Sequence, residues 1–544
     1  MSQSLRGADI VAGSLARLGC KKIFTLSGNH IMSIFDAALD AGLDLVHVRH
    51  EAAAVHMADA WGRLTGEPGV ALVTGGPGHA NAVGALFTAL AAESPMVLLS
   101  GHAATWELGR GGFQEMRQAD MAAPVTKAAW TSTSADALAR DVGEALHMAT
   151  AGRPGPVHVS FPSDLLDARV AADAVAWPNG QDRIFAPALP DTIADAVLED
   201  ISGAARPLIV AGPMLSNVSG RALLEQLEAA TSTPCVVVEI ARGMADATLG
   251  AFADLAARVD LVVLLGKALD FTLQWTKSPA FDPDVRVIAI DPEAALVERA
   301  ARETGARLAL GCIADARSAA ATLIARATPR KIRDDAWRRE ARALLDGRPA
   351  AWQTLASQTA HKLHPAEVFR TLRPYVERDP DTVLICDGGE FAQWGQAMLP
   401  VRRRLVNGVA GAIGASLPFA LTARMVEARA PVFAVLGDGT IGFHLAEFET
   451  AVRRNLPFVC MVGNDARWNA ESQIQLREYG ANRQHGCDLL PARYDQVAAA
   501  LGGHGELVER AADLAPAIAR ALASGKPACV NVMIESIAAP SIRL

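Results

Sequence analysis

Val432 to Thr440 read Val-Phe-Ala-Val-Leu-Gly-Asp-Gly-Thr, a β-like apolar run that ends in Gly-Asp-Gly-Thr. A helix-patterned segment follows it, and then a second apolar run, Phe458 to Val462, which ends in Gly463-Asn464-Asp465. Short apolar runs that close on glycine with an acidic or amide side chain are typical of parallel strands. We therefore expect Asp438 and Asp465 to lie at the carboxyl ends of two neighbouring strands, where open α/β sheets bind their ligands.

These two aspartates have the chemistry of a metal site. Gly-Asp-Gly alone is more often a turn, and Asn-Asp is equally common in loops. Their combination, one strand-helix-strand unit apart, is much less common. Two hard oxygen ligands beside backbone N–H groups freed by glycine suit a divalent cation that itself holds a diphosphate.

The stretch resembles the signature of thiamine diphosphate (ThDP) enzymes, in which Gly-Asp-Gly is followed one βαβ unit later by Asn-Asn. The resemblance implies a Mg²⁺ ion held by Asp438, by Asp465 and by the backbone carbonyl of Arg467. Because this chain has Asn464-Asp465 in place of Asn-Asn, both residues stay open as the second side-chain ligand. Aspartate binds Mg²⁺ at least as well as asparagine but repels the diphosphate more.

Length and composition describe a globular protein of several domains. The 544 residues exceed what one core supports, with 51% apolar and 20% charged residues and a net charge of −8. The acidic balance and few aromatics argue against nucleic-acid or membrane binding. No signal peptide or membrane-spanning run is evident, so we expect a cytoplasmic protein. Seven cysteines without a C-x-x-C pair favour neither zinc nor a disulfide framework.

Alternating helical and strand patterns predict an α/β fold with three doubly wound parallel-sheet domains, at 1–170, 191–330 and 361–544. Between them, 171–190 has the composition of a linker, and 330–348 that of a solvated, charge-rich helix. The layout resembles the pyrimidine-binding, central Rossmann-like and diphosphate-binding domains of the acetolactate synthase branch. No G-x-G-x-x-G fingerprint follows a central strand, which disfavours a nicotinamide dehydrogenase and favours a spacer. Whether the central domain holds FAD or ADP stays open.

The catalytic carboxylate is expected in the first domain. Arg49-His50-Glu51 and the alanines after it match the R-H-E-x-x-A pattern that follows a strand in this branch. A desolvated glutamate there would bond N1′ of the cofactor's pyrimidine and help the cofactor lose its C2 proton. The alternative is a carboxylate that only stabilises a helix N-terminus.

Two glycine-rich stretches resemble cofactor loops of the family. Gly75 to Asn81 resembles S-G-P-G-x-x-N, and Asn407 to Pro418 resembles G-x-M-G-x-x-L-P, in which a bulky residue bends the cofactor. Ile413 would be that wedge, and the carbonyl of Gly411 would accept from the 4′-amino group. For Gly75 to Asn81 the alternative is a bare turn, and for Ile413 it is a plain buried helix residue. The cofactor contacts that the resemblance implies are Gly28, Glu51, Gly76, Pro77, Asn81, Gly389, Glu390, Gly411, Ile413, Gly437, Gly439, Thr440, Asn464 and Trp468.

Substrate contacts are expected near the reactive carbon. His30 has a Gly-x-His-Ile context that resembles benzaldehyde lyase, and Phe113-Gln114 resembles acetolactate synthases. We expect His30 to move a proton of the donor hydroxyl and Gln114 to hydrogen-bond the adduct oxygen. A lone loop histidine is also often exposed or a cap, and that alternative stays open. The implied substrate contacts are His30, Phe113, Gln114, Ala470 and Ile474.

The resemblance implies a ThDP- and Mg²⁺-dependent carbon–carbon lyase or carboligase that acts on 2-oxo acids or 2-hydroxy carbonyl compounds through a C2 ylid and an enamine. Small Ala470 leaves room for an acceptor aldehyde, whereas the sequence of residues 463–468 is similar to the corresponding segment of 2-hydroxyacyl-CoA lyases. A 2-hydroxyacyl-CoA lyase, or an oxalyl-CoA-type decarboxylase, is therefore the alternative. A noncatalytic scaffold is disfavoured by Glu51 and the acidic ligands. The resemblance also implies a homodimer or homotetramer with active sites at the subunit interface.

Overall fold

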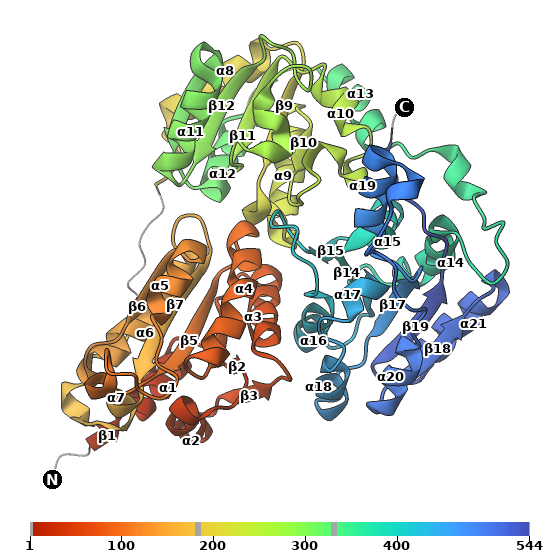
Figure 1. Cartoon of the computed structure of the whole chain (residues 1–544). Helices are drawn as coiled ribbons and strands as arrows, with labels where there is room; N and C mark the ends of the chain where they lie inside the picture. The colour runs from red at the N-terminus through yellow and green to blue at the C-terminus, as the bar shows by residue number, and fades with distance from the viewer. Residues whose placement is uncertain (1–3, 180–186, 328–333, 543–544) are drawn as a thin grey trace. The chain divides into compact units, whose positions relative to one another are not determined.

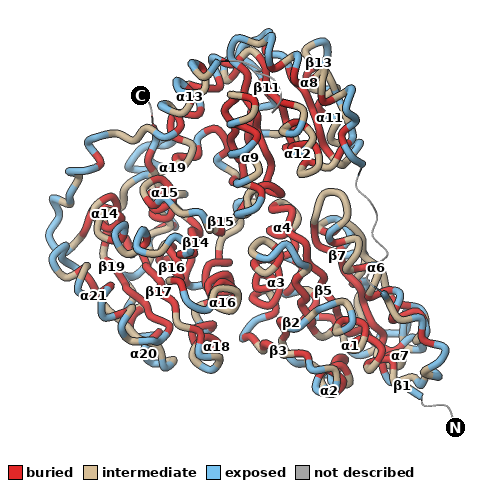
Figure 2. Tube along the Cα trace, turned by 180° about the vertical axis from the view of Figure 1, so that it is seen from behind, coloured by how far each residue is buried: buried red, intermediate tan, exposed pale blue. Residues whose placement is uncertain are grey.

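Three parallel sheets form the framework of the chain (Figure 1). The computed structural model describes residues 4–179, 187–327 and 334–542. Contacts divide the chain into two compact units: an N-terminal unit of 1–185 with 421–426 and 449–454, and a C-terminal unit of the remaining residues. Figure 2 shows the inner strands of each sheet buried, whereas several edge strands and the outer faces of the helices are partly exposed. No helix in the described ranges has the length and hydropathy needed to cross a membrane.

The N-terminal unit contains a six-stranded sheet in the order β3-β2-β4-β5-β7-β6, with all neighbours parallel. Helices α1, α2 and α6 pack together over one hydrophobic cluster, and α3 packs on α4 and β4. The strands are β2 (Lys22–Thr25), β3 (Asp44–His47), β4 (Gly69–Val73), β5 (Met96–His102), β6 (Ala128–Thr131) and β7 (Pro156–Pro162). The helices are α1 (Gly7–Arg17), α2 (Met32–Asp40), α3 (Glu51–Thr65), α4 (Pro77–Ala91), α5 (Gln118–Ala122), α6 (Leu138–Thr150) and α7 (Ser163–Asp167).

The first part of the predicted linker packs on this unit. Strand β8 (Arg169–Ala171) pairs antiparallel with β1 (Ser4–Arg6), and the guanidinium of Arg17 lies 4.2 Å from the ring centroid of Trp177. Residues 180–186 of the predicted linker lie outside the described residues.

The central sheet of the C-terminal unit has the order β10-β9-β11-β12-β13, with a hydrophobic cluster on each face. Its strands are β9 (Pro207–Ala211), β10 (Cys235–Val237), β11 (Leu261–Leu265), β12 (Arg286–Asp291) and β13 (Leu308–Ile313). Its helices are α8 (Asp191–Gly203), α9 (Val218–Thr231), α10 (Phe252–Ala256), α11 (Ala294–Thr304) and α12 (Ala316–Ala327).

The prediction of a solvated helix over 330–348 was wrong, because one face of the helix that forms there is buried. Helix α13 (Ala336–Asp346) buries Trp337, Ala341 and Leu345, and Trp337 Nε1 donates to the carbonyl of Pro207 at 2.8 Å. The spacing of four residues places these three apolar side chains on one stripe of the helix, and the charged residues occupy the other faces. Residues 330–333 lie outside the described part of the chain.

The third sheet has the order β15-β14-β16-β17-β19-β18, which repeats the strand order of the N-terminal sheet. Its strands are β14 (Val383–Asp387), β15 (Arg403–Val406), β16 (Val432–Gly437), β17 (Val459–Asn464), β18 (His504–Val508) and β19 (Ala528–Met533). Its helices are α14 (Pro365–Val376), α15 (Gly389–Met398), α16 (Ser416–Val426), α17 (Asp438–Ile441), α18 (Glu447–Arg453), α19 (Asn469–Tyr479), α20 (Tyr494–Ala500) and α21 (Ala511–Ala523).

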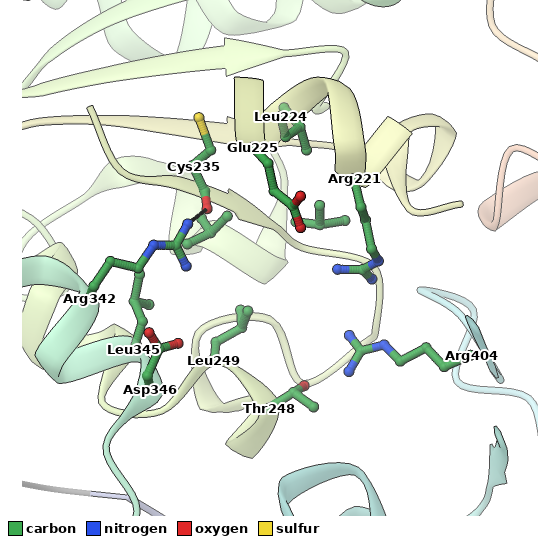
Figure 3. Close-up of a pocket in the computed structure, with 12 residues that line it drawn as sticks. Arg221, Leu224, Glu225, Cys235, Thr248, Leu249, Arg342, Leu345, Asp346 and Arg404 are labelled. Atoms are coloured by element: carbon green, nitrogen blue, oxygen red, sulfur yellow. Dashed lines mark hydrogen bonds between the residues drawn. The ribbon is translucent and has the colours of Figure 1, made fainter. Parts of the chain in front are cut away.

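An ion-pair cluster joins the central and third sheets within the C-terminal unit. Oε1 of Glu239 accepts hydrogen bonds from Arg221 on α9 and from Arg404 on β15, with lengths of 2.6 and 2.8 Å. Both guanidinium groups face a pocket that is also lined by Glu225 and Asp346, so carboxylates offset the cationic charge there (Figure 3). Strand β15 leads directly into residues 407–418, the loop that carries Ile413. The ion-pair cluster therefore anchors the start of this loop.

Candidate active site

The strand order of the third sheet creates a crevice between β14 and β16. The chain runs from β14 to β15 on one side and then returns to β16 on the other side. Ligands of open α/β sheets bind at such a reversal, beyond the carboxyl ends of the strands. Asp438 directly follows β16 and Asp465 directly follows the parallel neighbour β17, as the sequence predicts.

Asp438 and Asp465 form a buried acidic pair. Asp438 is 2% exposed, and its Oδ2 accepts a hydrogen bond from the backbone N–H of Arg467 at 3.1 Å. Burial raises the pKa of Asp438, and burial together with the charge of Asp438 raises the pKa of Asp465. Two buried carboxylates that repel each other are stabilised by a proton or by a shared cation. Their donor set of hard oxygens fits Mg²⁺.

Asn464 has a different environment from its neighbour. Its Nδ2 donates to the carbonyl of Ala492 and to Oδ1 of Asn531, and its Oδ1 accepts from the N–H of Ala466. These bonds tie the Asn464 amide to the surrounding backbone and to β19, whereas Asp465 lines the adjoining pocket. The geometry therefore favours Asp465 over Asn464 as the second side-chain ligand.

The pocket at this edge, counted with its open mouth, measures about 520 Å³. Most of the site residues predicted in the third domain line it: Gly389, Glu390, Ile413, Gly437, Asp438, Gly439, Thr440, Asp465, Arg467, Trp468 and Ala470. Gly411 and Ile474 are not among its lining residues. Gly411 lies beside Ala241, and Ile474 is 43% exposed on α19.

Glycines allow the strand ends to approach each other. A Cβ atom at Gly388, where φ is +71°, would lie 2.1 Å from Oγ1 of Thr440, and one at Gly439 would lie 2.5 Å from the ring of Trp468. The turn after β14 therefore packs directly on the turn after β16. Helix α15 begins at this point, and its free N–H groups, with the Thr440 hydroxyl, suit a diphosphate.

Arg242 of the central domain compensates the negative charge of Glu390. Its carboxylate accepts bonds of 3.1 and 3.2 Å from Arg242 and another bond from the N–H of Ala539. Without Arg242, a glutamate in the first turn of α15 would repel a diphosphate. Arg242 is thus a residue of the site that the sequence did not point to, because its partner lies 148 residues away.

Asp387 holds the loop that carries Ile413. Its Oδ2 accepts from the N–H groups of Gly414 and Ser416, at 3.0 and 2.8 Å. Burial raises the pKa of Asp387 to about 6 in spite of these bonds. In the sequence Asp387 stands out only as the last residue of a strand, so its role as a loop anchor was missed.

The N-terminal sheet has the equivalent crevice between β2 and β4, and His30 lies in it. His30 Nδ1 hydrogen-bonds with Oγ1 of Thr74 at 3.1 Å, and its ring stacks on Phe113 with centroids 5.9 Å apart. A Cβ atom at Gly28 would lie 2.3 Å from Cβ of Thr74, so glycine is required there. His30 is 6% exposed, which excludes the exposed-histidine alternative, and burial lowers its pKa.

Glu51 begins α3 and is 9% exposed. Its Oε2 accepts a 3.1 Å hydrogen bond from Nδ2 of Asn81, and a Cβ atom at Gly78 would lie 3.3 Å from its Oε1. The predicted loop 75–81 enters helix α4 at Pro77. The structure thus brings the Glu51 carboxylate and this glycine-rich segment together in one place.

Gln114 reaches the same segment from another loop. Its φ is +56°, and a Cβ atom at Gly76 would lie 2.5 Å from the Gln114 carbonyl oxygen. Thr74, which bonds His30, and Gln118, which bonds Gly76, were not predicted as site residues. Neither belongs to a motif, and only the folded chain reveals their contacts.

Comparisons with known proteins agree with this geometry. The family models described as thiamine pyrophosphate enzyme, N-terminal and C-terminal TPP binding domains, match residues 5–121 and 387–532. An acetolactate synthase large subunit of Mycobacterium tuberculosis is 33% identical, over 99% of this chain and 98% of that protein. A 2-hydroxyacyl-CoA lyase 2 of Danio rerio is 30% identical, over 97% of this chain and 91% of that protein. A catabolic acetolactate synthase of Raoultella terrigena is 28% identical, over 98% and 96%. This chain therefore belongs to the thiamine pyrophosphate enzyme family.

Proposed function

We propose that the protein is a ThDP- and Mg²⁺-dependent carbon–carbon lyase or carboligase that acts on 2-oxo acids or 2-hydroxy carbonyl compounds. The observation that carries the proposal is the buried pair Asp438 and Asp465 on neighbouring strand ends, which places two hard oxygen ligands side by side. Relatives named as acetolactate synthases support the same activity.

The residues of the third domain would bind the charged end of the cofactor. Asp438, Asp465 and the carbonyl of Arg467 would hold Mg²⁺, with other coordination positions left for diphosphate oxygens and water. The Thr440 hydroxyl and the N–H groups at the start of α15 would bind the diphosphate. Ile413, held through the loop that Asp387 anchors, would support the bend of the cofactor.

The residues of the first domain would manage protons. When bound, the cofactor supplies a carbon nucleophile that adds to carbonyl groups and then accepts their electrons. Glu51, oriented by Asn81, would hold the proton at N1′ of the pyrimidine. His30 has a lowered pKa and is therefore neutral at pH 7, so it can accept a proton from a donor hydroxyl. Gln114 would donate to the oxygen of the adduct, and Phe113 would cover the His30 ring.

The experiment that tests the activity is a donor screen with purified protein, ThDP and Mg²⁺. Pyruvate, glyoxylate and benzoin are offered with and without an acceptor aldehyde, and release of CO₂ or of aldehyde is followed together with the coupled product. We expect ThDP-dependent turnover of at least one donor. Absence of turnover with every donor would contradict the proposal, and absence of turnover with a 2-hydroxyacyl-CoA as well would favour a noncatalytic scaffold.

Lysis of a 2-hydroxyacyl-CoA is the second candidate, because a relative of that name aligns over nearly the whole chain. In this reaction the bond between the carbonyl carbon and the hydroxyl-bearing carbon breaks, the aldehyde leaves, and the remaining acyl unit takes up a proton and is released as formyl-CoA. A 2-hydroxyacyl-CoA substrate distinguishes the two activities, with the free 2-hydroxy acid and oxalyl-CoA as comparisons. Aldehyde release that needs the CoA thioester would favour the lyase over the 2-oxo acid carboligase.

We further propose a homodimer or homotetramer whose active sites combine the N-terminal unit of one subunit with the C-terminal unit of another. Glu51 and Asp438 belong to different units of the chain, which allows a complementation test. Inactive Glu51→Gln and Asp438→Ala proteins are unfolded together and reassembled. Mixed dimers would contain one intact site, so we expect about a quarter of wild-type activity to return after statistical reassembly. Sites made within one chain would give no recovery.

A further inference from the structure

Gln118 is a buried side chain of the first domain for which the proposed chemistry has no direct use. It is 1% exposed and begins α5, four residues after Gln114. Its Oε1 accepts from the N–H of Gly76 at 2.8 Å, and its Nε2 donates to the carbonyl of Gly101 at 3.0 Å and to Oγ of Ser160 at 2.9 Å. One side-chain amide therefore connects the loop after β4 with strands β5 and β7.

The backbone of Gly76 needs such an anchor. Its φ of +58° and ψ of −114° lie in a region that side-chain-bearing residues rarely adopt. Gly76 is buried, so its N–H requires an acceptor, and the Gln118 side chain is that acceptor. The same glycine packs against the carbonyl of Gln114. The position of Gly76 therefore also determines the position of the Gln114 backbone.

A chain of hydrogen bonds fixes the orientation of the Gln118 amide. His158 is fully buried and neutral, because desolvation lowers its pKa far below the usual value. Its Nδ1 contacts the Leu98 carbonyl at 3.1 Å and must carry the proton, so Nε2 accepts from Oγ of Ser160 at 2.9 Å. The Ser160 oxygen is then an acceptor for Nε2–H of Gln118. This order leaves Oε1 of Gln118 facing the Gly76 N–H, as the site requires.

We propose that Gln118 is a positioning residue that transmits the rigidity of strands β5 and β7 to Gly76 and Gln114, and so sets where the pyrimidine ring and the substrate adduct lie relative to Glu51. This inference rests on the proposed ThDP chemistry and assigns a role within it to a residue outside the cofactor motifs. An amide is suited to this role because it offers one acceptor to Gly76 and two donors to the strands. A glutamate would place a carboxylate oxygen against the Gly101 carbonyl.

The test compares Gln118→Leu, which keeps the side-chain size but removes all three bonds, with Ser132→Ala as a matched control. Ser132 donates a buried 2.6 Å bond to Asp141 in the same domain, and this bond does not involve the Gly76 loop. The first readout is amide hydrogen exchange of the peptide 74–82 in the protein without cofactor. We expect exchange at Gly76 to rise at least tenfold in Gln118→Leu and to stay at the wild-type rate in Ser132→Ala.

Cofactor affinity and rate constants provide the second readout. For Gln118→Leu we expect the Kd for ThDP with Mg²⁺ to rise about tenfold and kcat at saturating ThDP to fall about tenfold or more, because small displacements of reacting groups are costly. The donor KM should change less than kcat. A role in stability alone would lower the unfolding temperature in both variants and leave kcat and Gly76 exchange equal in the two; that result would overturn the proposal.

Ser160→Ala tests the same chain of bonds if Gln118→Leu does not fold. It removes one acceptor of Gln118 but leaves the bond to Gly76 available, so we expect smaller changes in the same direction. Unchanged hydrogen exchange at Gly76 together with unchanged ThDP affinity in Ser160→Ala would contradict a role for the hydrogen bonds that connect Ser160, Gln118 and Gly76. If the wild-type protein turned over no donor, the proposed function would fail, while hydrogen exchange would still decide whether Gln118 fixes the loop.

Discussion

Asn81 donates a hydrogen bond from its Nδ2 to Oε2 of Glu51 at 3.1 Å. This bond fixes one oxygen of the carboxylate, while the other oxygen lies toward Gly78, where a side chain would crowd it. The carboxylate is therefore held in one orientation before any cofactor binds. Such preorganisation is what a group that holds a proton on a bound ring requires.

Glu51→Gln should lower kcat by about 10²- to 10³-fold, because an amide of the same size does not hold the N1′ proton. The Kd for ThDP with Mg²⁺ should stay within about threefold, since general acid–base groups contribute little to ground-state binding. Steady-state turnover and calorimetric titration measure the two quantities. Exposed Glu67→Gln in the same domain is the control, and near-wild-type turnover of Glu51→Gln would reject its role.

Asp465→Asn should weaken Mg²⁺ binding in the presence of ThDP at least tenfold, because a charged ligand is lost from a hard-cation site. Asn464→Ala should instead lower the unfolding temperature, since its amide bonds Ala492 and Asn531. Metal titrations and thermal unfolding of both variants separate these effects. Equal losses of metal affinity would contradict the assignment of Asp465 over Asn464.

Gly388→Ala should abolish tight ThDP binding. The added Cβ would lie 2.1 Å from Oγ1 of Thr440 and would force apart the two turns that form the diphosphate site. Gly480→Ala is a matched control in the same unit, because its φ of +87° is also positive but nothing lies within 4 Å of the added atom. Both variants should lose about 1 to 3 kcal/mol of stability, because both residues combine a positive φ with a ψ near +160°, a region that essentially only glycine adopts. Similar ThDP affinities in both would exclude close packing at Gly388 as the cause.

The buried Asp387 predicts a pH dependence of stability. Its pKa is about 6 in the folded protein and about 4 in an unfolded chain, so between these values the folded state binds one more proton. The free energy of unfolding therefore decreases as pH rises through this window, by up to about 3 kcal/mol from this group. Asp387→Asn lacks the titration. Urea unfolding of both cofactor-free proteins is measured from pH 4.5 to 7.5. The free energy of unfolding of the variant should increase relative to that of the wild type as pH rises, and a constant difference between the two would contradict the prediction.

Sequence patterns predicted the parts of the site that are local. A strand that ends in Gly-Asp places its aspartate at a sheet edge whatever the rest of the chain does, and Asp438 and Asp465 follow this rule. Glu51 and the loop 75–81 were predicted because they match motifs, and the structure brings them together.

The residues that hold the site in place could not be predicted from local sequence patterns, because their hydrogen-bonding partners are distant in the sequence. Gln118 bonds a residue 42 positions away, and Arg242 bonds one 148 positions away. The choice between Asn464 and Asp465 depended on Ala492 and Asn531, which no local pattern includes. Helix α13 was predicted to be solvated because its three buried apolar residues stand among many charged residues.

Calorimetric titration of the metal-free protein with ThDP shows whether a metal ion on Asp438 and Asp465 anchors the cofactor. With Mg²⁺ present we predict saturable binding of one ThDP per chain, and with EDTA, or in the double variant Asp438→Ala and Asp465→Ala, no measurable binding. Binding of equal affinity in EDTA or in the double variant would contradict a cofactor anchored through a metal ion on these two aspartates.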